Sequence, residues 1–214
     1  MMRRTVFALL LVTVAIALTL TTAQGPFDQS SFAFQQYTGY FGTVFASPAP
    51  MLVAAEGTFL LTRPGKHGAD VDQWGDGLVR LRGALIQSGR DRMLEIEPGS
   101  IRAASGPPRV PPPIEHIGNF HLTGEIADGK CYLGVMNTAR GKVHRDCAVR
   151  CLSGGAPPVF LVRNEAGTLN TLLLTGLGRE ILNYVAEPVR LSGELQREGS
   201  QLVLKADPSS LLRE

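Results

Sequence analysis

Four residues in one short segment have the types and spacing to bind a metal ion or to carry out thiol chemistry. Cys131 is followed, after a stretch that contains Gly and Asn, by His144, Cys147 and Cys151. If residues 143–152 form about two turns of helix, positions 144, 147 and 151 fall on one stripe of its surface. Three thiolates and one imidazole form a Cys₃His set, which suits zinc, copper(I) or an iron–sulfur centre. The sequence therefore predicts a metal or redox site here.

The same three cysteines allow a different chemistry in an oxidising compartment, where a disulfide is expected. Cys131 is placed to bond either Cys147 or Cys151 and to fix the segment to the rest of the fold. Cys147 and Cys151 lie one helical turn apart and are poorly placed to bond each other. Because the chain contains three cysteines, one disulfide leaves one thiol, so a thiol–disulfide redox role also stays open.

An internal duplication predicts the elements around this segment. An offset of 110 residues aligns residues 79–100 with residues 189–210 without a gap. Nine aligned positions are identical, among them Val79/Val189, Gly83/Gly193, Gly89/Gly199 and Pro98/Pro208. Each copy alternates apolar and polar residues on both sides of a Gly turn, which predicts a β-hairpin. Gly83 and Gly193, inside the first strand of each hairpin, predict a bulge or a sharp bend.

Three strands are predicted before each hairpin, and their order identifies a fold class. They cover 40–45, 51–54 and 58–62 in the first copy, and 120–127, 159–163 and 171–175 in the second, which also has a short helix over 179–185. This order resembles the OB-fold, a five-stranded Greek-key barrel with a helix between strands three and four. We predict a mainly β protein with two tandem OB-like five-stranded barrels after an N-terminal hydrophobic helix.

The two copies differ in one connection. Residues 46–50 join the first two strands of the first copy, whereas the same connection in the second copy is the insertion 129–158. Long loops in compact domains are usually functional or disordered, and this loop borders the usual ligand-binding face of OB-folds. The predicted organisation is a signal peptide or anchor (1–24), a tether (25–36), OB-like domain 1 (37–104), a Pro-rich linker (105–117) and OB-like domain 2 (118–214).

The N-terminus predicts export. Two arginines, Arg3 and Arg4, precede an apolar run from Val6 to Leu20, as in a secretory signal. Extended through Ala23, the run approaches the length of a membrane-spanning helix. A cleaved signal and an uncleaved anchor both place the rest of the chain outside the cytoplasm, either periplasmic or anchored in the inner membrane and facing the periplasm.

Composition and motifs exclude several functions. The chain has 21 Lys and Arg residues against 19 Asp and Glu residues, and 7% of its residues are aromatic. This composition argues against the basic, aromatic-lined groove that nucleic-acid binding needs. The sequence has no P-loop, dinucleotide fingerprint or serine nucleophile elbow. No pair of carboxylates can be assigned as acid and base, so a non-enzymatic role is favoured over an enzyme.

A secondary candidate lies in the turn-rich segment 63–68 of the first copy. Lys66 and His67 stand side by side between glycines and together have the chemistry to bind an anion or a metal ion. A solvated turn accounts for the same residues, and is the favoured interpretation.

The chain resembles exported bacterial proteins of uncharacterised role with an OB-like barrel and a Cys…HxxCAxxC segment. The motifs that carry the resemblance are GEIADGKC (124–131), HRDCAVRC (144–151) and GAPP (155–158). It covers residues 118–208 well and the first copy only by architecture. The resemblance implies export and an OB-like fold, and implies no activity.

The sequence therefore favours a non-enzymatic exported or membrane-anchored binding protein. Its Cys/His insertion would bind a metal, a small ligand or a partner. One alternative is a thiol-redox or electron-transfer accessory protein. The other is an assembly module of a membrane or periplasmic complex, in which a disulfide is purely structural.

Overall fold

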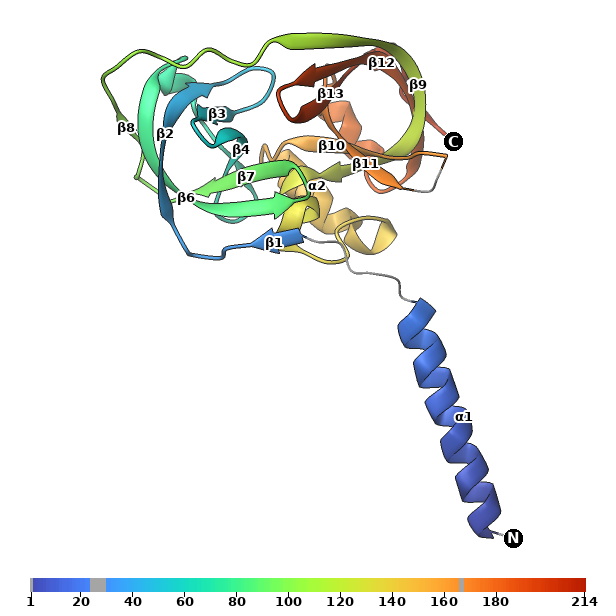
Figure 1. The fold of residues 1–214 in the computed structure, drawn as a ribbon. Coiled ribbons are helices and arrows are strands. Elements are labelled where there is room, and N and C mark those ends of the chain that lie inside the picture. Colours follow the sequence, from blue (N-terminus) through green and yellow to red (C-terminus); the bar gives the residue numbers. More distant parts are fainter. Residues whose placement is uncertain (1, 24–29, 166–167) are drawn as a thin grey trace.

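The computed structural model describes residues 2–23, 30–165 and 168–214 (Figure 1). Helix α1 (Met2–Ala23) comes first, and strands dominate the rest of the described chain. Residues 3–22 of α1 have a mean hydropathy of 2.3 and are not buried. The helix is therefore long and apolar enough to cross a membrane, a property that signal sequences share.

The first ring of strands is a closed five-stranded barrel. Antiparallel pairs join β6 to β2, β2 to β3, β3 to β4 and β6 to β7, and the parallel pair β4–β7 closes the ring. Short strands extend its edges. The barrel strands are β2 (Thr38–Phe45), β3 (Met51–Ala54), β4 (Gly57–Arg63), β6 (Leu78–Ser88) and β7 (Asp91–Ile96), and the added elements are β1 (Ser30–Phe32), β5 (His67–Gly68), η1 (Asp72–Trp74) and β8 (Arg102–Ala103).

The second ring repeats this circuit of pairings. Strands β9, β10 and β11 pair in antiparallel order, β11 pairs in parallel with β13, and β12 pairs with both β13 and β9. Its elements are β9 (Ile114–Asp128), β10 (Pro158–Arg163), β11 (Leu169–Thr175), η4 (Arg179–Asn183), β12 (Pro188–Glu198), β13 (Gln201–Ala206), η5 (Pro208–Ser210) and β14 (Leu212–Arg213). Figure 1 shows the two rings side by side.

The predicted hairpins are confirmed, and their registers preserve the offset of 110 residues. Gly83 pairs with Ile96 in the first copy, and Gly193 pairs with Ala206 in the second. A Cβ at Gly193 would collide with the backbone carbonyl of Lys205. The glycine therefore permits a close approach of two strands, while the register shift in β12 falls between residues 195 and 196.

Each ring has its own apolar core, and a third cluster joins the two rings. The cluster contains Leu60 of β4 and Leu173 of β11. Leu60 is paired with Met93 of β7, and Leu173 is paired with Val203 of β13, and these two partners also belong to the cluster. Met93 and Val203 are equivalent at the offset of 110. The two rings therefore pack through matching strands, as the two subunits of a symmetric dimer do.

Three predicted boundaries were wrong. Part of the expected tether 25–36 is strand β1, which pairs with β6, while residues 25–29 lie outside the described residues. Residues 114–117 of the expected linker belong to β9, because the long strand β12 offers its backbone edge to them. The expected helix over 179–185 is a 3₁₀ turn that ends at Asn183.

Candidate metal centre

The insertion between β9 and β10 forms three short helical elements. A π-helical turn, η2 (Cys131–Val135), comes first, and a 3₁₀ turn, η3 (Lys142–His144), leads into helix α2 (Arg145–Ser153). Gly154 and Gly155 end α2, and Gly155 has φ +90°, a conformation that favours glycine. The helix predicted over 143–152 is therefore present, with its first residues in the 3₁₀ turn.

The three cysteines of the insertion come together. Their Sγ atoms, from η2 and α2, all lie within 4.8 Å of one another. Cys131 and Cys151 are buried, and Cys147 is half-buried. All three are free thiols in the structure, and a disulfide from Cys131 to Cys147 or Cys151 stays a prediction. Helix geometry explains the cluster, because residues four apart share one face of α2.

His144 lies beside this cluster, bonded to a carboxylate. Its Nε2 donates to Asp128 Oδ2 at 3.1 Å, and both side chains are buried. Asp128 Oδ1 accepts a hydrogen bond of 2.8 Å from the backbone N–H of Cys131. Among the described residues, His144 groups with Asp128 and Cys131 and not with the other two cysteines. Because His144 belongs to the 3₁₀ turn, it leaves the helical stripe on which the sequence placed it.

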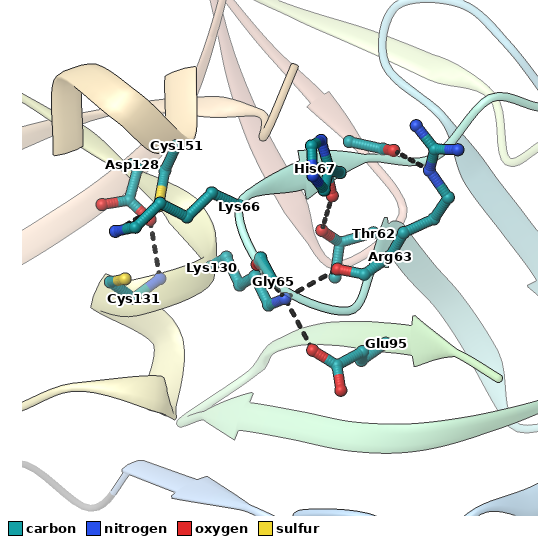
Figure 2. Close-up of polar contacts among 11 residues, drawn as sticks. Thr62, Arg63, Gly65, Lys66, His67, Glu95, Asp128, Lys130, Cys131 and Cys151 are labelled. Carbon is teal, nitrogen blue, oxygen red and sulfur yellow. Dashed lines mark hydrogen bonds and ion pairs between the residues drawn. The ribbon is translucent and has the colours of Figure 1, made fainter. Parts of the chain in front are cut away.

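A lysine from the first barrel reaches the thiols. Lys66, in the turn between β4 and β5, places its Nζ 2.7 Å from Cys147 Sγ and 3.9 Å from Cys151 Sγ. Figure 2 shows its side chain extending toward Cys151. The neighbouring His67 is exposed and points away, and its carbonyl accepts a hydrogen bond from Thr62. Of the two weak candidates in this turn, the structure brings Lys66 into the cluster and leaves His67 out.

Hydrogen bonds and charges within the cluster shift the pKa values of its members in different directions. The hydrogen bond between Cys131 and Cys151 raises the pKa of Cys131, and burial adds to the rise. The same hydrogen bond lowers the pKa of Cys151, with a further lowering from the Lys66 charge. The hydrogen bond to Cys147 raises the pKa of Lys66. The arrangement therefore moves the pKa values of Cys131 and Cys151 in opposite directions.

A second lysine crosses between the barrels in the opposite direction. Lys130, next to Cys131, forms an ion pair of 2.6 Å with Glu95 of β7, and both side chains are buried. Its Nζ also donates to the carbonyls of Arg63 and Gly65, each at 2.7 Å (Figure 2). The three N–H groups of the ammonium are thus all satisfied. Sequence reasoning missed Lys130 and Glu95, because neither stands in a motif.

Backbone contacts fix the turn that carries Lys66 against the end of α2. The N–H of Gly68 donates to the carbonyl of Gly154 at 2.9 Å. A Cβ at Gly154 would collide with the carbonyl of Lys66, and a Cβ at Gly68 would collide with that of Gly155. Glycines at these positions therefore permit the approach that delivers Lys66 to the thiols.

A fourth sulfur lies at the outer side of the cluster. Met136 Sδ is 3.8 Å from Cys147 Sγ, and the Met136 side chain is 44% exposed. Sequence reasoning missed this residue, and its position a few residues after Cys131 was the only available signal.

Comparisons of the chain with protein-family models, with curated proteins and with solved structures gave no match. The resemblance to exported bacterial proteins therefore stays a prediction. A fold alone does not define a function, whereas the chemistry of a site restricts it.

Proposed function

We propose that the protein binds a thiophilic metal ion through Cys131, Cys147 and Cys151. The observation that carries the proposal is the convergence of three thiol sulfurs from two elements to within 4.8 Å of one another. Unlike a disulfide, which needs two cysteines, this arrangement brings all three together. Contacts around the ligands support it, since Asp128 holds the Cys131 backbone and Lys66 bonds Cys147; such contacts orient metal ligands.

The donor set narrows the choice of metal. The usual iron–sulfur clusters take four cysteines, and the chain has three. Within the part of the chain that the structure describes, His144 groups with Asp128 and Cys131 and not with Cys147 and Cys151, so the three-thiol set stands without it as a fourth ligand. Three thiolates suit copper(I), or zinc with an outside ligand. In either case Cys131, Cys147 and Cys151 would hold the ion.

The proposed setting is an exported or membrane-anchored binding protein made of two OB-like barrels. The circuit of strand pairings in each ring supports the OB-like assignment. The site then occupies the loop between the first two strands of the second barrel, a position that OB-folds use for ligands. Helix α1 supports export, as a signal or as an anchor.

The test is a titration of the full chain, purified in detergent micelles and kept reduced, with Cd²⁺ as a spectroscopic probe for thiolate ligands. We expect one equivalent to bind with sulfur-to-metal charge-transfer absorption. Cys151→Ser should lose the absorption, and His121→Ala, which removes a histidine that bonds Ser192, should keep it. A reduced protein that binds no stoichiometric metal, with Cys131 quantitatively disulfide-bonded after air oxidation, would overturn the proposal.

A second candidate function is thiol–disulfide exchange, which the contact between Lys66 and half-buried Cys147 favours. The Cys147 thiolate would attack a disulfide of an exported protein and release one of its thiolates. The Cys131 thiolate would then attack Cys147 Sγ and displace the second. The partner gains two thiols as this chain forms one disulfide, so electrons balance. Slow alkylation of Cys147 by iodoacetamide at neutral pH, no faster than that of an unfolded cysteine, would eliminate this candidate.

A further inference from the structure

The donors around the proposed site are sorted by chemical softness. Three thiol sulfurs face one another, and the thioether sulfur of Met136 lies 3.8 Å from Cys147 Sγ. The harder donors nearby, the Asp128 carboxylate and the His144 imidazole, are bonded to each other. Thiolates suit both copper(I) and zinc, so the softer thioether of Met136 is the donor here that favours copper(I).

The charge beside the sulfurs also discriminates between ions. The Lys66 ammonium lies 2.7 Å and 3.9 Å from two of the three Sγ atoms, and the backbone contacts of its turn with Gly154 hold it there. Coulomb repulsion from this charge is twice as large for a divalent ion as for a monovalent one. The other nearby ammonium, Lys130, is neutralised by Glu95. The Lys66 charge therefore lowers the affinity of the site for Zn²⁺ more than its affinity for Cu⁺.

The sulfurs also form a path from solvent to the interior. Met136 is 44% exposed, while Cys131 and Cys151 are only 4% and 2% exposed. Cys147, which is half-buried, lies between these extremes and contacts Met136. An ion that arrives at the surface meets the thioether first and the buried thiols last.

From these observations we propose that the site is selective for Cu⁺ over divalent ions and that Met136 is the sulfur through which Cu⁺ enters and leaves. This proposal rests on the proposed metal-binding function. Loading is a ligand exchange in which no electron moves. Each protonated thiol that binds the ion releases its proton to solvent, and Cu⁺ leaves when an outside sulfur or nitrogen ligand replaces the thiolates.

The experiment measures two affinities and one rate with the reduced full chain in detergent. Competition with a chromophoric Cu⁺ chelator and with a Zn²⁺ chelator dye gives the affinities, and stopped-flow transfer of Cu⁺ to the chelator gives the rate. We expect the wild-type chain to bind Cu⁺ at least about a hundredfold more tightly than Zn²⁺. Zn²⁺ binding equal to or tighter than Cu⁺ binding would overturn the inference and leave the proposed function standing, whereas no binding of either ion would overturn both.

Lys66→Gln tests the charge. We expect it to raise the Zn²⁺ affinity about tenfold, with a smaller gain for Cu⁺. Lys66→Arg should restore the discrimination if the charge is the cause. Lys142→Gln removes an exposed lysine of the same insertion and should change neither affinity. Equal effects of Lys66→Gln and Lys142→Gln would overturn the role of Lys66, provided that circular dichroism shows both variants folded.

Met136→Leu tests the path. We expect it to slow Cu⁺ transfer about tenfold and to change the Cu⁺ affinity less than about threefold, since the thiolates supply most of the binding. Val143→Ala truncates another exposed apolar side chain of the insertion and should leave the rate unchanged. An unchanged rate in Met136→Leu would overturn the role of Met136.

Discussion

The two barrels share a circuit of strand pairings and differ most in one connection. Residues 46–50 link the first two strands of the first barrel, and residues 129–157 link those of the second. The hairpins that follow keep the same register at an offset of 110 residues. The comparison shows that two rings with the same circuit of pairings and separate cores can differ in a single loop, and that this loop carries the candidate site.

The site nevertheless depends on both barrels. Lys66 crosses from the first barrel to the thiols of the second, and Lys130 crosses from the second barrel to Glu95 of the first. One barrel supplies the sulfurs and the other supplies a charge next to them. If this exchange holds the junction together, breaking either contact should destabilise the folded chain.

Breaking the buried ion pair should have the largest effect. Glu95→Ala leaves the Lys130 ammonium buried without its carboxylate, and such a loss costs about 3–5 kcal/mol. Urea unfolding of the full chain measures the change in the free energy of unfolding. Glu97→Ala is the matched control, because Glu97 pairs with an Arg82 side chain that is 57% exposed, and an exposed pair contributes about 0–1 kcal/mol. Equal effects of the two variants would contradict the structural role of Lys130.

A substitution that displaces the turn carrying Lys66 from α2 should have the next largest effect on the free energy of unfolding. A Cβ at Gly154 collides with the Lys66 carbonyl, so Gly154→Ala should lower the free energy of unfolding by about 1–3 kcal/mol. It should also move Lys66 away from Cys147, which a rise in Zn²⁺ affinity would detect. Gly39→Ala is the control, since a Cβ there meets no described atom within 4 Å. A Gly154→Ala protein with unchanged stability would show that the turn is not clamped against the helix.

The hairpins and the thiol cluster were predictable from the sequence because their signals are local. Gly89 and Gly199 mark matching turns, and the spacing of Cys147 and Cys151 fits one face of a helix. The contact of Lys66 with Cys147 was not predictable, because it joins residues 81 positions apart in two barrels. The strand over residues 114–117 was also not predicted, because it forms by pairing with β12, which lies far away in the sequence.

A pH-dependent difference separates the two copies at equivalent positions of their hairpins. Asp91 of the first copy aligns with Gln201 of the second, and Gln201 Nε2 lies 3.5 Å from Asp91 Oδ1. Burial raises the pKa of Asp91 to about 6, and the Arg90 charge offsets only part of the rise. The folded protein therefore binds a proton at Asp91 in the interval between its unfolded pKa of 3.8 and about 6. Its contribution to stability falls as pH rises through that interval, and stays low above it.

Asp91→Asn should remove this dependence. Above pH 7 we expect the variant to be more stable than the wild-type chain by about 1–3 kcal/mol, and the two should converge near pH 4. Urea unfolding at a series of pH values measures the difference, with Asp72→Asn at an exposed position as the control. If the free energies of unfolding of Asp91→Asn and wild type differ by the same amount at every pH, Asp91 is not the source of the pH dependence.

The smallest effect is expected at His67, which follows Lys66 and is the first residue of β5. Its side chain is exposed and points away from the cysteines (Figure 2), and its structural contribution is a backbone carbonyl that bonds Thr62. His67→Ala keeps that carbonyl, so the free energy of unfolding should change by less than about 0.5 kcal/mol. Metal affinity should also be unchanged, as measured by the same competition assay. A large loss of affinity in a folded His67→Ala protein would contradict the placement of His67 outside the site.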